Sequence, residues 1–129
     1  MKYTLFILTT LFLYGCSGFD FNKSYEVSRK AAELIQQQKY AELEEMYSYN
    51  FKNSESAEAK EKKYKMIMDA VGEIQSVELM DSVAGALNEY REAEYNYLFK
   101  CTNMNVITKI IIVEDFGDYL VASISIQQE

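Results

Sequence analysis

The spacing of the apolar residues changes from a helical period to a strand period at Gly72. Before this glycine, apolar residues recur every three to four positions, as in helices that bury one face. After it, they alternate with polar residues or form β-branched runs, as in strands. A chain that places its helices first and its strands last is typical of the α+β class.

Three helices are predicted ahead of Gly72. The first begins at Ser24, a residue type that caps helix starts, and its apolar stripe extends to Ile35. A shorter helix follows over 40–47, and then the polar segment KNSES indicates a loop. The third helix ends at Gly72, because glycine is common just beyond a helix C-terminus.

The third predicted helix contains the lysine-rich run KEKKYK at 60–65. Two acid–base pairs in and beside it, Glu58/Lys62 and Glu61/Lys65, have the i,i+4 spacing of stabilising ion pairs on a helix. We therefore interpret this run as a solvated, self-paired helix face and not as an anion-binding site.

Four strands are predicted after Gly72. Apolar and polar residues alternate over 77–83 and 94–101, and the runs NVITKIIIVED and DYLVASISIQ are rich in β-branched residues. Turns are expected at Gly85, 103–105 and 115–118, and connections this short join antiparallel strands only. We expect a curved four-stranded antiparallel sheet with one face packed on the three helices.

The first fifteen residues have the pattern of a secretory signal, in which Lys2 precedes an apolar run. The run is shorter than the roughly 20 residues that a membrane-spanning helix needs. Leu13-Tyr14-Gly15-Cys16 then resembles the lipobox of bacterial lipoproteins, whose signal is cut before a lipid-carrying cysteine. The resemblance implies a signal peptide over 1–15 and a lipid-anchored protein of the cell envelope.

By this resemblance Cys16 is the lipid attachment site, 16–23 contain the lipidated cysteine and a tether, and 24–129 form a single domain. Two or three acyl chains on one residue anchor a protein durably. Ser17 follows the cysteine, which favours the outer membrane, facing the periplasm, if the cell is Gram-negative.

Composition excludes several classes of function. The chain has a formal charge of −7, which becomes −8 once Lys2 leaves with the signal, and such an acidic protein is unsuited to nucleic acid. The chain contains no histidine, which excludes catalytic sites that use histidine. It also lacks the commonest metal ligand, because that ligand is histidine. With Cys16 lipidated, Cys101 has no disulfide partner. We expect no catalytic residues, no metal and no cofactor.

The segments "AAELIQQQKYAELEEMYS" and "AVGEIQSVELM", followed by long strands and a late hairpin, carry a resemblance over about 24–127. Their order is similar to that of the cystatin-like, nuclear-transport-factor-two-like superfamily, and in particular to its small bacterial lipoproteins. The resemblance implies a cone-shaped sheet wrapped around the first long helix, with a cavity between them. Members include isomerases, dehydratases, binding modules and dimeric scaffolds.

An aromatic stripe is the main candidate for a ligand-binding wall. Tyr95, Tyr97 and Phe99 share one side of a strand, and Tyr64 from the third helix faces the same layer. Small-molecule sites combine such apolar walls with a few hydroxyl groups. The alternative is an ordinary core, with the tyrosine hydroxyls at its rim. Cys101 has the same parity and is expected to be a buried small hydrophobe.

An enzyme of isomerase or hydrolase type on the same fold is an alternative function. It would use Asp69 or Asp81 as a general base beside a tyrosine. The neighbours of Asp69 suit a solvent face, whereas Asp81 interrupts an apolar strand face. The acidic cluster at Glu114, Asp115 and Asp118 lacks the spacing of an EF-hand, so we interpret it as an exposed turn.

The strand over 106–113 is apolar on both sides, since Val106, Ile110 and Ile112 alternate with Ile107, Ile111 and Val113. One antiparallel sheet in a small domain normally exposes a polar face. We therefore expect a non-catalytic binding module that forms a homodimer through this sheet face. A protein partner there, a small apolar ligand in the cavity, and an envelope inhibitor or exclusion protein remain alternatives.

Overall fold

The computed structural model describes residues 18–84 and 91–129, so the predicted lipid site Cys16 and the predicted turn at Gly85 lie outside the described residues. Within these described residues, four helices precede four strands. The elements are α2 (Phe21–Gln36), α3 (Tyr40–Glu44), α4 (Tyr49–Ser54), α5 (Ala57–Val71), β1 (Ile74–Ala84), β2 (Glu92–Cys101), β3 (Asn105–Asp115) and β4 (Asp118–Gln128). The strands form one antiparallel sheet in the order β1-β2-β3-β4, which confirms the predicted α+β class and meander.

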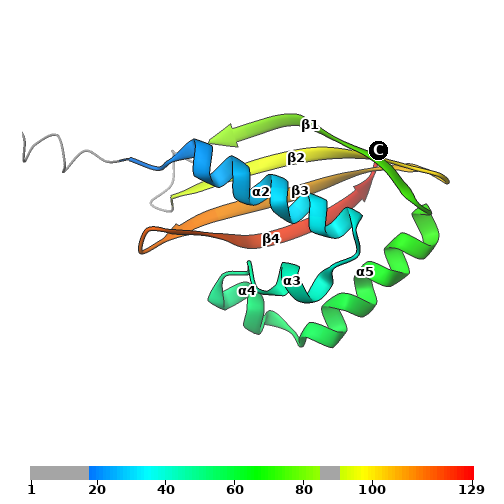
Figure 1. The fold of residues 1–129 in the computed structure, drawn as a ribbon, viewed down its shortest axis with the longest axis horizontal. Coiled ribbons are helices and arrows are strands. Elements are labelled where there is room, and N and C mark those ends of the chain that lie inside the picture. Colours follow the sequence, from blue (N-terminus) through cyan, green and yellow to red (C-terminus); the bar gives the residue numbers. More distant parts are fainter. Residues whose placement is uncertain (1–17, 85–90) are drawn as a thin grey trace, which may run out of the picture.

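The long helix α2 lies across one face of the sheet, and α3, α4 and α5 form a second group beyond β4 (Figure 1). We call the face under α2 the inner face and the opposite one the outer face. The inner face of β2 buries alternate residues, beginning at Ala93 and ending at Cys101. The side of α2 turned toward it is made of small and aliphatic residues: Ser24, Ser28, Ala31, Ala32, Leu34 and Ile35. The small side chains allow close packing of helix and sheet.

The predicted start of the first helix is wrong. The helix begins at Phe21, and its cap is Asp20, whose carboxylate accepts the N–H of Lys23 at 3.1 Å. Ser24 instead lies inside the helix, where it is completely buried and its hydroxyl donates to the Phe21 carbonyl at 3.0 Å. Both residue types are good caps, so residue type alone did not distinguish them.

The prediction of three helices is also wrong, because α4 occupies a segment expected to be a loop. The hydroxyl of Ser48 caps it by accepting the N–H of Phe51 at 3.3 Å. None of its residues is fully buried, so it has no apolar stripe by which a helix could be recognised.

Two predicted boundaries are confirmed. Gly72 ends α5 with a φ of 85° and donates its N–H to the Met68 carbonyl at 2.9 Å. Phe116 and Gly117 form the two-residue turn between β3 and β4, with φ values of 50° and 86°. Positive φ at both positions is typical of the type I′ turn, whose twist matches that of antiparallel strands.

Candidate functional site

The predicted wall residues of β2 lie on the inner face, where α2 covers them. Tyr97 is buried and its hydroxyl lies 2.6 Å from that of Ser28. Tyr95 makes the equivalent contact with the hydroxyl of Ser24. Burial raises the pKa of both tyrosines, that of Tyr97 to about 12, although the serine contact acts in the opposite direction. Both phenol groups are therefore already engaged by α2.

Phe99 and Cys101 continue the same row toward the end of β2. Phe99 is completely buried and Cys101 nearly so. Burial raises the pKa of the Cys101 thiol, and its Sγ lies 3.7 Å from the Phe99 carbonyl oxygen. The interpretation of Cys101 as a buried small hydrophobe is confirmed.

Tyr64 belongs to a different group of rings, formed by α3, α5 and the chain between α3 and α4. Its ring stacks on Tyr40, with centroids 5.3 Å apart and planes within 3°. Its hydroxyl lies 3.1 Å from that of Tyr47. Burial raises the pKa of Tyr64 to about 12. Burial also raises the pKa of Tyr47, and the neighbouring Tyr64 raises the pKa of Tyr47 further.

The four predicted wall residues do not line one common cavity. Tyr95 borders a hollow of about 360 Å³ between α2 and the start of β2, together with Phe21 and Leu79. Tyr64 borders a separate hollow of about 180 Å³ against Ile124 and Ile126 of β4. The structure thus divides the aromatic residues between two places in the fold.

A buried ion pair beside Tyr64 was missed from the sequence. Lys60, expected on a solvated face, is only 4% exposed, and its Nζ donates to Glu44 at 2.9 and 3.3 Å. It also donates to the Lys52 carbonyl at 2.9 Å and lies 5.2 Å from the centre of the Tyr47 ring. Three donated bonds satisfy an ammonium group, so this lysine links α3, α4 and α5 and has no free proton donor.

The signal that could have identified Lys60 is its spacing. It lies four residues before Tyr64, on the same buried stripe of α5 that continues through Met68 and Val71. A lysine on an apolar stripe is buried only when an anion is near. That anion comes from α3, which the sequence alone could not place.

The candidate general bases do not lie with the tyrosines. Asp69 is exposed on α5, as its neighbours suggested. Asp81 is exposed on the outer face, opposite Asn96 of β2, whose amide donates to its carboxylate at 2.6 Å. Tyr95 and Tyr97 have the opposite parity in β2 and face α2, so the sheet separates them from Asp81.

The acidic residues near the β3–β4 hairpin are solvated or paired. Asp115 and Asp118 are exposed, and Glu114 accepts a bond of 2.7 Å from Arg91. Within residues 18–84 and 91–129, no three acidic or cysteine side chains are grouped so that they could hold a metal ion.

The outer face of the sheet keeps large apolar side chains partly exposed. They include Val83 of β1, Leu98 of β2, Ile107, Ile111 and Val113 of β3, and Leu120 of β4. Between them runs a polar row across the sheet, containing Asp81, Asn96, Lys109 and Ser125. A hollow of about 260 Å³ lies over this row, bordered by Met80, Ile107 and Gln127 among others.

The charges of the outer face alternate in sign. Lys109 pairs with Glu94 at 3.2 Å, and Lys100 pairs with Glu78 at 3.4 Å. The apolar residues are thus interspersed with both acids and bases, although the chain as a whole is strongly acidic. Charges of both signs can be matched by complementary charges on a partner surface.

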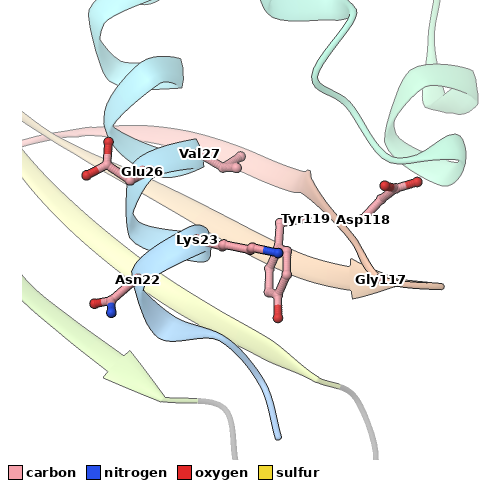
Figure 2. Close-up of a pocket in the computed structure, with 7 residues that line it drawn as sticks. All are labelled: Asn22, Lys23, Glu26, Val27, Gly117, Asp118 and Tyr119. Carbon is pink, nitrogen blue, oxygen red and sulfur yellow. The ribbon is translucent and has the colours of Figure 1, made fainter. Parts of the chain in front are cut away.

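Another hollow lies between the first turns of α2 and the β3–β4 hairpin. It measures about 480 Å³ and is bordered by Asn22, Lys23, Glu26, Val27, Gly117, Asp118 and Tyr119. Figure 2 shows Lys23 reaching from the helix toward Tyr119 of β4. The Tyr119 hydroxyl accepts the backbone N–H of Asp20 at 2.7 Å, which joins the start of the domain to its last strand.

No protein-family model matches the chain, and no significant match appears among curated proteins or among solved structures. None of the helices in the described residues is both long and apolar enough to cross a bilayer.

Proposed function

We propose that the protein is a lipid-anchored, non-catalytic module of the bacterial cell envelope that acts through protein contacts of its outer sheet face. The observation that carries this proposal is the row of partly exposed Ile107, Ile111 and Val113 on the side of β3 turned away from α2. Cys16 is the proposed anchor, and the lipobox pattern supports it. If the cell is Gram-negative, the proposed location is the outer membrane, facing the periplasm, and the support for it is Ser17 directly after the cysteine.

The proposed fold type is the cystatin-like, nuclear-transport-factor-two-like cone. Its support is the long α2 lying along one face of a four-stranded antiparallel meander. Within this fold type a non-catalytic role is favoured by the use of Tyr95 and Tyr97 as partners for helix serines. The buried Lys60 is likewise saturated with acceptors.

The partner that the outer face fits best is a second copy of the chain. Four strands of about eleven residues, spaced at roughly 4.8 Å with a rise of roughly 3.3 Å, present about 700 Å² in projection. A standard interface buries roughly 800 Å² per partner. The alternating charges also suit a twofold arrangement, in which Lys109 of one copy can face acidic groups such as Asp81 of the other.

Sedimentation equilibrium of the mature chain without its lipid, at micromolar concentration, tests this proposal. The wild type is expected at twice the chain mass, and Ile107→Asp is expected to shift it to the monomer. Met66→Asp is the matched control, since Met66 is exposed on α5, away from the sheet. A monomeric wild type would contradict the dimer. An extra mass of a few hundred daltons in native mass spectrometry would instead favour a small apolar ligand.

A further inference from the structure

Three exposed apolar side chains gather at one end of the domain: Phe21, Val83 and Phe116, with Phe116 completely exposed and the others about half exposed, at 48% and 54%. Strand pairing places Val83 toward this end, because Val83 is opposite Glu94, which is opposite Ile111 in the second half of β3. The start of α2 lies at this same end (Figure 1). We name it the anchor end.

Helix and hairpin are neighbours at the anchor end. Asn22 and Lys23 of α2 share a hollow with Tyr119 and with Gly117, the residue directly after Phe116 (Figure 2). Phe21 borders a second hollow together with Val83. Phe21 and the hairpin that carries Phe116 therefore lie at the first turn of α2, whereas Val83 lies toward the same end of the sheet in the outer-face row of Glu94 and Ile111.

The backbone conformation at position 116 is unfavourable for phenylalanine, so the stability of the fold does not account for this residue type. Its φ is 50°, in the left-handed region, where asparagine or glycine is favoured and a phenylalanine is strained. A completely exposed ring gains no packing in return. A contact outside the domain would account for an aromatic side chain at this position.

The length of chain before α2 identifies that contact. Cys16 precedes the helix cap Asp20 by four residues, which span at most roughly 14 Å when fully extended. A lipid on Cys16 therefore holds the anchor end close to the bilayer. We propose that Phe116, together with Phe21 and Val83 toward the same end of the domain, inserts into the interface of the membrane to which the chain is anchored. This inference rests on the proposed lipid attachment at Cys16.

The charges around the hairpin specify the kind of membrane surface. Asp115 and Asp118 are exposed on either side of the turn, and Lys23 is the base that borders the hollow next to it. A strongly anionic bilayer would repel the two carboxylates, whereas a zwitterionic bilayer would not. Phosphatidylethanolamine with phosphatidylcholine is therefore the surface that fits, and aromatic rings in such an interface add apolar burial to the lipid anchor.

The chain contains no tryptophan, so a single introduced tryptophan reports on its own position. The test uses the full lipidated protein in vesicles of phosphatidylethanolamine and brominated phosphatidylcholine, whose bromine quenches tryptophan within the bilayer. Phe116→Trp places the reporter at the anchor end, and Met104→Trp is the matched control. Met104 is exposed in the turn between β2 and β3, which lies at the opposite end of the sheet.

Quenching is expected to be at least threefold stronger for Phe116→Trp than for Met104→Trp. Equal quenching of the two variants in a protein whose mass includes the lipid would overturn this inference and leave the proposed anchor intact. A mature protein without lipid would overturn both. Val83→Trp is a second reporter at the anchor end if Phe116→Trp alters the circular dichroism spectrum, and it carries the same expectation.

Discussion

The hydroxyl of Ser28 in α2 lies 2.6 Å from the hydroxyl of Tyr97 in β2, and Ser24 and Tyr95 make the same contact one helical turn earlier. Four helical residues advance about 6 Å and two strand residues about 6.6 Å, so the two pairs can form together. The helix therefore runs along β2, in the same direction, at one defined position. Because serine is small, the aromatic rings fit between helix and sheet.

The Ser28–Tyr97 contact is expected to stabilise the fold by about 1 kcal/mol, the usual net value for a buried hydrogen bond. Tyr97→Phe and Ser28→Ala should each lower the free energy of unfolding by about that amount or more, since each leaves a buried hydroxyl with fewer partners. In the double variant, the loss in free energy of unfolding should be clearly smaller than the sum of the losses in the two single variants. Urea denaturation of all four proteins measures the coupling, and strictly additive losses would mean that the two hydroxyls do not interact.

Stability is expected to fall at alkaline pH. The pKa of Tyr64 and of Tyr97 is raised to about 12 in the folded protein by burial, against 10.0 for an ordinary tyrosine. The unfolded chain therefore loses these protons first, so the stabilisation is complete below pH 10 and is lost as the pH rises from 10 to 12. Each tyrosine should add a slope approaching about 1.4 kcal/mol per pH unit in this window.

Urea denaturation between pH 9 and pH 11.5 measures this loss. Tyr97→Phe should make the dependence shallower, whereas Tyr49→Phe, which removes an exposed phenol, should leave it unchanged. Identical pH dependence in the Tyr97→Phe protein and the wild type would show that this phenol ionises equally well in both states.

Lys60→Met is expected to destabilise the protein by about 3 kcal/mol or more. The change leaves the carboxylate of Glu44, which is mostly buried, without its cation, and removing one partner of a buried pair is strongly unfavourable. Lys63→Met is the control, because the Lys63–Glu55 pair is exposed and should contribute less than about 1 kcal/mol. Thermal unfolding of both variants at neutral pH compares them, and equal losses would contradict a structural role specific to Lys60.

Gly72→Ala and Gly117→Ala should lower the free energy of unfolding by different amounts, although both glycines have φ values near 85°. A Cβ at Gly72 would overlap the hydroxyl of Thr102, whose oxygen accepts the N–H of Glu73, whereas a Cβ at Gly117 meets open space. We expect about 1 kcal/mol of destabilisation for Gly117→Ala, from strain alone, and a clearly larger loss for Gly72→Ala. Chemical denaturation of the two variants checks the order, and the reverse order would show that the Thr102 side chain moves aside freely.

The strand half of the chain could be predicted because its signals are local. Alternation marks β2, and the Phe116–Gly117 turn lies between two β-branched runs, so the hairpin follows from a few neighbouring residues. The end of α5 at Gly72 is equally local. These features need no knowledge of which distant residues they meet.

The remaining features depend on partners far away in the sequence. Ser24 and Ser28 are polar residues on a buried helix face, and their partners across the core are the hydroxyls of Tyr95 and Tyr97, about seventy residues later. Lys60 is buried because Glu44 of another helix neutralises it. The prediction of a single aromatic wall failed for the same reason, because Tyr64 packs on Tyr40 and not on β2.

The bond between the Asp20 N–H and the Tyr119 hydroxyl, which are 99 residues apart, bears on the order in which the chain can fold. Helix α2 has its partners in β2 and β4, so it cannot dock on them before nearly the whole chain has been synthesised. Contacts of such long sequence separation form slowly. Until then the apolar side of α2 has no packing partner, and a chain that ends before Asp118 should leave it as a persistent target for chaperones and proteases.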